Sequence, residues 1–353
     1  MDKPELKRIK PSWKGIAFLI AATAITLTVI FVKLANPKQI WAVIENYPVK
    51  YLLLAMAAIC LAWVIDTLRI RIILASTGHR IAFPLLMVIM TANHFVTLVT
   101  PFTAGGVPFL IYMLYRYCLN VGQATGIISS ASLGAQIGLI SVISLILALM
   151  KNVPDQIAPY FSYLKLIVLL YGLILAALIY VIWHGHRFRA WFERFSKYPN
   201  ISQWFNTFVS TYRQTFTKHG RYFIGAALCG SGYFGLLYLA GCFLLTGLQV
   251  NPALSFDNYS IATLLGISSS FTPIPGGAGV SEIFSVYMLD DRFSDARLGA
   301  FIILWRTIIF YFPIIIGCLA FAYLILVWSK HQQPEQAPGQ PQSGSEQQNL
   351  PEE

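Results

Sequence analysis

Residues 272–280 read TPIPGGAGV and lie in the middle of an otherwise apolar stretch, 256–289. A similar segment, TPFTAGGV at 100–107, interrupts a second apolar stretch, 83–119. Proline removes an amide donor from a membrane helix, and paired glycines expose backbone that needs other partners. Each stretch is also too short for two comfortable crossings of about 20 residues plus a turn. We therefore predict two hairpins of half-length helices that return to the side from which they entered.

The rest of the chain has the composition of a protein surrounded by lipid. Hydrophobic residues make up 56% and charged residues 11% of its 353 positions, whereas about a quarter of a soluble domain is charged. This balance excludes a soluble fold and predicts an all-α polytopic membrane protein, with residues 1–330 forming one transmembrane domain. Six apolar stretches are long enough to cross a bilayer: 13–34, 51–73, 123–149, 161–183, 222–247 and 297–328.

The formal net charge of +10 indicates topology rather than nucleic-acid binding. Lysines and arginines lie before 13–34, after 51–73, in the loop before 222–247 and after 297–328, so the positive-inside rule places both termini in the cytoplasm. The acidic residues Asp290, Asp291 and Asp295 then fall outside. The run that begins at Gly15 is too long for a typical signal peptide, and we interpret it as an uncleaved first helix.

The cytoplasmic loop contains residues 187–218, in which aromatic and basic side chains alternate at helical spacing. This pattern predicts short amphipathic helices in the headgroup plane. Such helices either cap the cytoplasmic ends of the bundle or recruit anionic lipid. The polar segment 331–353, rich in Gln, Pro and Glu, is predicted to be a disordered cytoplasmic tail.

The two broken hairpins also indicate an internal repeat. Both contain Thr-Pro, a short spacer, Gly-Gly and a valine, and both apolar runs end in Tyr-Met-Leu. Three crossings separate the hairpins, so the second one enters from the opposite side. We therefore predict an inverted repeat, with one half at 13–149 and the other at 161–328. In transporters of this architecture the substrate binds between the repeats near the midplane.

The breaks themselves are candidate binding sites. The half-helices that begin near Val107 and Val280 direct free amides and the positive end of the helix dipole into the protein, where an anionic lipid phosphate would be stabilised. The alternative is that each break is a kink filled by neighbouring helices. The candidate residues at the breaks are Thr100, Gly105, Gly106, Thr272, Gly276 and Gly277.

Ionisable and polar residues within apolar stretches add further candidates. Arg306 lies well inside the last crossing, and Glu282 at the start of a half-helix is its best partner. This pair is either structural, or Arg306 binds a headgroup phosphate while Glu282 tunes the site or carries a proton. Asn93, His94 and Gln136 are either interhelical hydrogen bonders or ligands. Asp66 and Arg69 are interpreted as a local pair at a helix end.

We expect no metal or cofactor and no catalytic residue. The five cysteines are scattered singly, without the spacing of metal ligands. The motifs of zinc proteases, serine hydrolases and P-loop proteins are also missing from the sequence. Chemistry on a lipid headgroup would therefore need a partner that supplies it.

With these motifs in place, the chain resembles the transmembrane region of bacterial lysylphosphatidylglycerol synthases, a flippase-like family, over most of 13–328. The resemblance is carried by Asn93, the TPF-x-x-GG segment from Thr100, the TP-x-PGGAG segment from Thr272 with Glu282, and Leu304-Trp305-Arg306 with Tyr311, Pro313 and Gly317. One departure is Val107, where relatives often have a polar residue before the proline. That departure puts a polar substrate contact at this position in doubt.

The resemblance implies a lipid flippase-like transporter in a bacterial inner membrane. Its substrate would be an anionic or aminoacylated phospholipid such as lysylphosphatidylglycerol, with a polyprenyl-phosphate lipid as the alternative. Full-length relatives move the aminoacylated lipid to the outer leaflet and make it in a separate cytoplasmic domain. Because the sequence ends in the predicted disordered tail, we expect no such domain here and do not expect this chain to transfer lysine alone. The alternatives are a membrane subunit of a lipid-modifying enzyme, with a soluble synthase or envelope partner, and a lipid-binding scaffold. The oligomeric state stays open.

Overall fold

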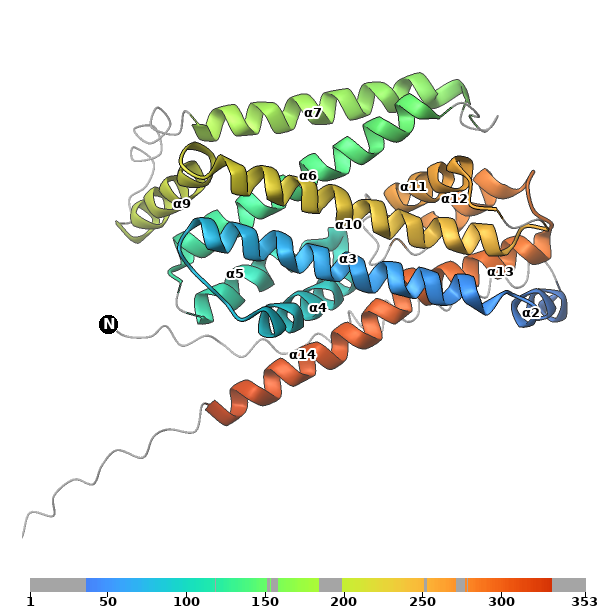
Figure 1. Cartoon of the computed structure of the whole chain (residues 1–353), viewed down its shortest axis with the longest axis horizontal. Helices are drawn as coiled ribbons and strands as arrows, with labels where there is room; N and C mark the ends of the chain where they lie inside the picture. The colour runs from blue at the N-terminus through green and yellow to red at the C-terminus, as the bar shows by residue number, and fades with distance from the viewer. Residues whose placement is uncertain are drawn as a thin grey trace, which may run out of the picture.

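The computed structural model describes residues 36–117, 119–150, 153, 158–183, 199–250, 253–270, 277 and 279–331. Within these residues the regular structure is entirely helical, and most of the long helices run nearly side by side (Figure 1). The fold class predicted from composition is confirmed. The predicted first crossing, the first part of the amphipathic loop, 187–198, and the tail beyond residue 331 lie outside the described residues.

Five of the predicted crossings are present as long apolar helices. They are α3 (Val49–Ser76), α6 (Val121–Leu149), α7 (Phe161–Trp183), α10 (Gly220–Gly247) and the continuous pair α13 (Asp295–Trp305) and α14 (Phe312–His331), joined by the π-helical turn η4 (Arg306–Tyr311). Several begin or end two to three residues beyond the predicted bounds.

Both interrupted stretches form pairs of short helices. The first consists of α4 (Phe83–Val99), the turn η1 (Pro101–Thr103) and α5 (Gly106–Arg116), and the second of α11 (Phe256–Ser270) and α12 (Val280–Leu289). Their lengths of 17, 11, 15 and 10 residues are all below the ~20 residues that cross a bilayer. Figure 1 shows α4 and α5 toward the end of the bundle that carries α9 (Pro199–Thr217), and α11 and α12 toward the end that carries α2 (Pro37–Glu45).

Each hairpin packs within its own apolar core. The core around α5 includes Ile73, Met113 and Ile127, from α3, α5 and α6. The core around α12 includes Ile59 and Phe301, together with residues of α10 and α11. Because α3 contributes to both cores, the segment of α3 between them passes through the middle of the bundle, where polar residues are found.

Helix α9 supports the capping interpretation of the amphipathic loop. Its aromatic side chains form a ladder in which Trp204 stacks on Phe208 at 5.7 Å and Tyr212 contacts Phe216 at 4.9 Å. Helix α9 packs against α6, where Gly122 leaves room for the backbone of Trp204. Burial raises the pKa of the Tyr212 phenol above its ordinary value, so the group stays neutral inside this contact. The aromatic face therefore packs on the bundle.

Helices α6 and α10 cross at very close range. A Cβ atom on Gly138 would overlap the backbone of Gly230 and Ser231, and a Cβ on Gly230 would lie 2.8 Å from the Cα of Ala135. Small residues spaced four apart allow membrane helices to approach in this way. The crossing joins the two predicted halves of the repeat.

Candidate functional site

The beginning of α12 is shaped by two glycines and one carboxylate. Gly277 and Gly279 have φ angles of +64° and +86°, values that only glycine adopts readily. These angles turn the chain so that the amide of Gly279 donates to Oε2 of Glu282 at 2.9 Å. The Ser281 hydroxyl donates to the same oxygen at 2.8 Å. Glu282 thus caps its own helix, and its negative charge lies at the positive end of the helix dipole.

Arg306 completes this cluster from the last crossing. Its Nε donates to Glu282 Oε1 at 2.5 Å and its Nη2 to Glu282 Oε2 at 2.6 Å. Nη2 also donates to the Ser281 hydroxyl and to the carbonyl of Gly277. Arg306 is 2% and Glu282 3% exposed. The forked geometry is that of the strongest arginine–carboxylate pairs.

The pairing fixes the second hairpin against the last crossing. Arg306 opens the π-helical turn η4, and its guanidinium carbon lies 5.3 Å from the ring centre of Phe310. π-Helical turns inside α-helices are frequent at functional sites. Because both oxygens of Glu282 already accept donors within the protein, the geometry favours the structural interpretation of this pair over direct phosphate binding by Arg306.

The break in the first hairpin is different. Phe102 and Thr103 have φ angles of 53° and 56°, a left-handed backbone conformation that is strained for such residues and is often found at functional sites. The Thr100 hydroxyl accepts from the amide of Gly105 at 3.0 Å. The first turn of α5 contains no acidic residue. The amides of Gly106 and Val107 therefore begin a helix whose positive end has no carboxylate cap of its own.

A second charged cluster lies between the two cores. On α3, Nε of Arg69 donates to Asp66 Oδ1 at 2.8 Å, and Nη1 donates to the carbonyl of Ala131 on α6. Asp66 is 4% and Arg69 7% exposed. The predicted local pairing is confirmed, but its predicted place at a helix end is wrong, because α3 continues to Ser76 and both side chains are buried inside the bundle. The sequence signal for a buried pair was a carboxylate and a guanidinium three residues apart within an apolar run.

His94 of α4 lies beside this pair. Its ring is stacked between Trp63, at 5.4 Å, and Tyr233, at 6.0 Å between ring centres. Its Nε2 lies 3.7 Å from Asp66 Oδ2, too far for a hydrogen bond. Within the described part of the chain, neither this buried nitrogen nor Asn93 Oδ1 has a hydrogen-bond partner. A Cβ placed on Gly106 would lie 3.1 Å from Asn93 Oδ1, so Asn93 directs this oxygen at the beginning of α5.

The predicted site residues therefore fall into three places. Arg306, Glu282 and Gly277 form one cluster, and Asn93, Thr100, Gly105 and Gly106 gather at the break of the first hairpin, with His94 next to them. Gln136 is separate, because its Oε1 accepts from the Tyr171 hydroxyl of α7 at 2.8 Å, as expected for an interhelical hydrogen bonder. Thr272 and Gly276 lie outside the described residues. Among those that are described, no three His, Cys, Asp or Glu side chains gather as metal ligands would.

The last crossing connects the two hairpins. Arg306 on it contacts the beginning of α12, whereas Gly317 packs against Thr91 and Phe95 of α4. Eleven residues of helix separate these contacts, which corresponds to about 16 Å along the axis. The hairpins thus approach one helix at two depths, with Phe312 between them.

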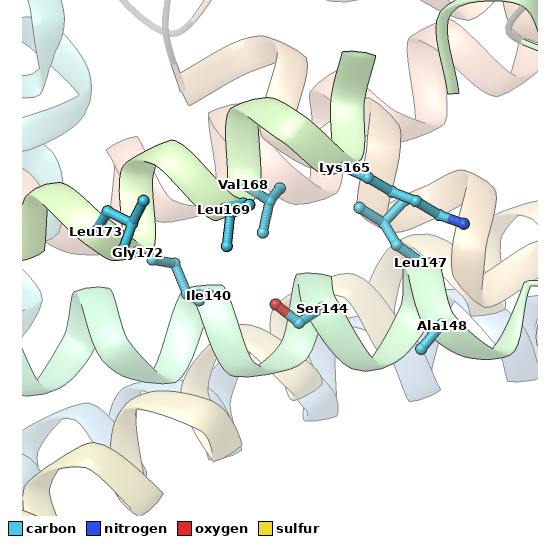
Figure 2. Close-up of a pocket in the computed structure, with 9 residues that line it drawn as sticks. All are labelled: Ile140, Ser144, Leu147, Ala148, Lys165, Val168, Leu169, Gly172 and Leu173. Atoms are coloured by element: carbon cyan, nitrogen blue, oxygen red, sulfur yellow. The ribbon is translucent and has the colours of Figure 1, made fainter. Parts of the chain in front are cut away.

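A groove on the outer surface of the bundle lies apart from these clusters. Figure 2 shows it between α6 and α7, with Ile140, Ser144 and Leu147 on one wall and Val168 and Gly172 on the other, and with Lys165 at one end. Its volume is ≈ 500 Å³ and its lining is almost wholly apolar. Helix α7 is largely exposed, so lipid chains would reach this groove directly.

The model of one protein family covers both hairpins and Arg306. The family is described as the lysylphosphatidylglycerol synthase TM region, and the match extends over residues 16–317. The chain belongs to this family. A UPF0104 membrane protein of Archaeoglobus fulgidus is 23% identical over 329 residues, which cover 88% of this chain and 96% of the relative.

Membership in the lysylphosphatidylglycerol synthase TM-region family confirms the resemblance found in the motifs. Together with the apolar helices it supports a multi-pass membrane protein of a lipid-related family. The matched relative is archaeal, so the bacterial inner membrane stays a prediction. The same holds for a soluble synthase or envelope partner.

Proposed function

We propose that this protein moves an anionic or aminoacylated phospholipid between the leaflets of its membrane. The headgroup passes between the two hairpins while the acyl chains remain in the bilayer. Phosphatidylglycerol and its lysyl derivative are the substrates that the family description favours. The lipid phosphate is the part that the protein binds, because the beginning of α5 has no acidic residue in its first turn and suits an anion.

One observation carries the proposal: the two hairpins have opposite placements and unequal caps. The beginning of α12 is closed by Glu282 and Arg306, whereas α5 starts without an acidic residue. Val107, in the first turn of α5, is 44% exposed. A helix beginning that is accessible and lacks a carboxylate is suited to a phosphate. The hairpin of α11 and α12, whose helix beginning is capped, then stays fixed, while the hairpin of α4 and α5 binds and releases the headgroup.

Reconstituted vesicles test this function. Purified protein is placed in liposomes with fluorescent phosphatidylglycerol, and the fraction of label accessible to an external quencher is followed over time. We expect faster exchange than in protein-free vesicles, and faster exchange of phosphatidylglycerol than of a zwitterionic lipid. Equal exchange rates with and without protein, for both phosphatidylglycerol and its lysyl derivative, would contradict the proposal.

Val107→Glu should slow this exchange at least severalfold while leaving the protein folded. The new carboxylate lies at the beginning of α5, where it is stabilised by about 0.3–1 kcal/mol and occupies the place of a phosphate. Val107→Gln, with nearly the same size and no charge, should slow exchange much less. Val121→Glu is the matched control, since Val121 begins α6 and is also 44% exposed. Equal effects at 107 and 121 would remove α5 from the route.

A further inference from the structure

The midpoints of three long helices meet at one histidine. Helix α3 spans residues 49–76, α10 spans 220–247 and the last crossing begins at 295 and ends at 331, so Trp63, Tyr233 and Phe312 each lie near the centre of a crossing. Trp63 stacks on Phe312 at 5.8 Å, and His94 is stacked between Trp63 and Tyr233. His94 therefore lies close to the middle of the membrane, the depth at which transporters bind substrates and coupling ions.

The groups that face this histidine come from two helices. Among the described residues, the charged and titratable ones are Asp66 and Arg69 of α3 and Tyr233 of α10, whose ring stacks on that of His94. Arg69 binds Asp66 through Oδ1 only, which leaves Oδ2 directed at His94. With a neutral imidazole, the charges of Asp66 and Arg69 cancel. One proton on Nε2 changes the cluster to a net charge of +1 in surroundings where an uncompensated charge is strongly unfavourable.

We propose, on the basis of the function above, that His94 and Asp66 form a proton site that couples lipid movement to a proton gradient. His94 Nε2 takes up a proton and donates it in a hydrogen bond to Asp66 Oδ2. The present 3.7 Å must shorten by about 1 Å for that bond, so α4 moves toward α3. No bond other than the N–H bond forms or breaks.

The proton affects the lipid site through the adjacent residue. Asn93 is next to His94 and directs its side chain at Gly106, where α5 begins. A shift of α4 therefore changes the beginning of α5, the end that binds the phosphate. The added positive charge is compensated when the anionic headgroup enters, so proton and anionic lipid bind together and leave together. This is symport with no net charge moved per cycle.

Equilibrium asymmetry between leaflets provides the test. Proteoliposomes with labelled phosphatidylglycerol receive a gradient of one pH unit, with the membrane potential clamped at zero by potassium and valinomycin. When one proton moves with each lipid, a tenfold difference in proton activity balances a tenfold difference in lipid concentration between the leaflets. The leaflet facing the alkaline side should therefore be enriched in labelled lipid up to about tenfold. Protein-free vesicles and vesicles treated with nigericin should show no such enrichment.

The outcomes separate coupling from transport. Rapid exchange that ends with equal leaflets despite the pH gradient overturns the proton site and leaves the flippase function standing. An absence of exchange under any gradient overturns both. His94→Gln and Asp66→Asn should each abolish the enrichment, whereas His219→Gln, at the surface end of α10, should keep it. Enrichment that persists in folded His94→Gln protein also overturns the assignment.

Infrared difference spectra of the purified protein give a readout that does not need transport. With phosphatidylglycerol present, whose negative charge compensates the added proton, acidification should give an imidazole protonation signal in the wild type that His94→Gln lacks and His219→Gln retains. Asp66→Asn should weaken that signal, because the protonated ring then donates to a neutral amide instead of a carboxylate. A spectrum unchanged by His94→Gln contradicts the site independently of the lipid assay.

Discussion

Glu282→Gln is expected to lower the free energy of unfolding by about 3–5 kcal/mol, because it leaves the buried Arg306 guanidinium without its counter-charge. Water cannot solvate this charge, since Arg306 is only 2% exposed. The cap at Gly279 also weakens when a neutral amide replaces the carboxylate. Thermal unfolding in detergent, together with denaturant titration in mixed micelles, measures the loss.

The double variant Glu282→Gln with Arg306→Met tests whether the stability lost in Glu282→Gln comes from an unpaired buried charge or from lost packing. Removing both charges should restore part of the stability lost in the single variant, because no unpaired charge remains buried. Glu45→Gln is the matched control, since Glu45 is an exposed carboxylate at the end of α2, and it should leave stability unchanged within about 0.5 kcal/mol. A double variant less stable than Glu282→Gln alone would contradict the electrostatic account.

Gly138→Ala is expected to destabilise the bundle by about 1–3 kcal/mol, although it adds only one methyl group. That methyl would overlap the backbone of α10 at Gly230 and Ser231, and backbone cannot move aside as a flexible side chain can. The two halves of the predicted repeat are forced apart at their crossing. Exchange of lipid in vesicles should fall together with thermal stability.

Gly172→Ala on α7 is the matched control and should stabilise the protein, whereas Gly138→Ala destabilises it. The nearest atom to a Cβ at Gly172 is 4.0 Å away, the Cδ1 of Ile140. Without a clash, alanine in place of glycine inside a helix stabilises by about 0.5–1 kcal/mol. Equal unfolding temperatures for Gly138→Ala and the wild type would show that the α6–α10 contact is looser than the structure indicates.

The sequence predicted the features that depend on local chemistry. Helix lengths follow from the thickness of the bilayer, and five of the six predicted crossings are present within the described residues. The breaks follow from proline and paired glycines, and the charge of Arg306 inside an apolar run required a partner such as Glu282. In each case lipid permits few arrangements of the residue type concerned, so the sequence pattern alone determines the local structure.

Only the tertiary structure decided which residues meet. Apolar residues lie on all sides of helices such as α3 and α10, so these helices lack the amphipathic pattern that indicates the inward face of a helix in a soluble protein. Nothing in the order of residues placed His94 beside Asp66, or Gln136 opposite Tyr171. Such contacts depend on how neighbouring helices rotate and approach, and at Gly138 this is set by the fit of two backbones. The sequence thus determined a membrane bundle with two broken hairpins, and helix packing placed a buried charge cluster at its centre.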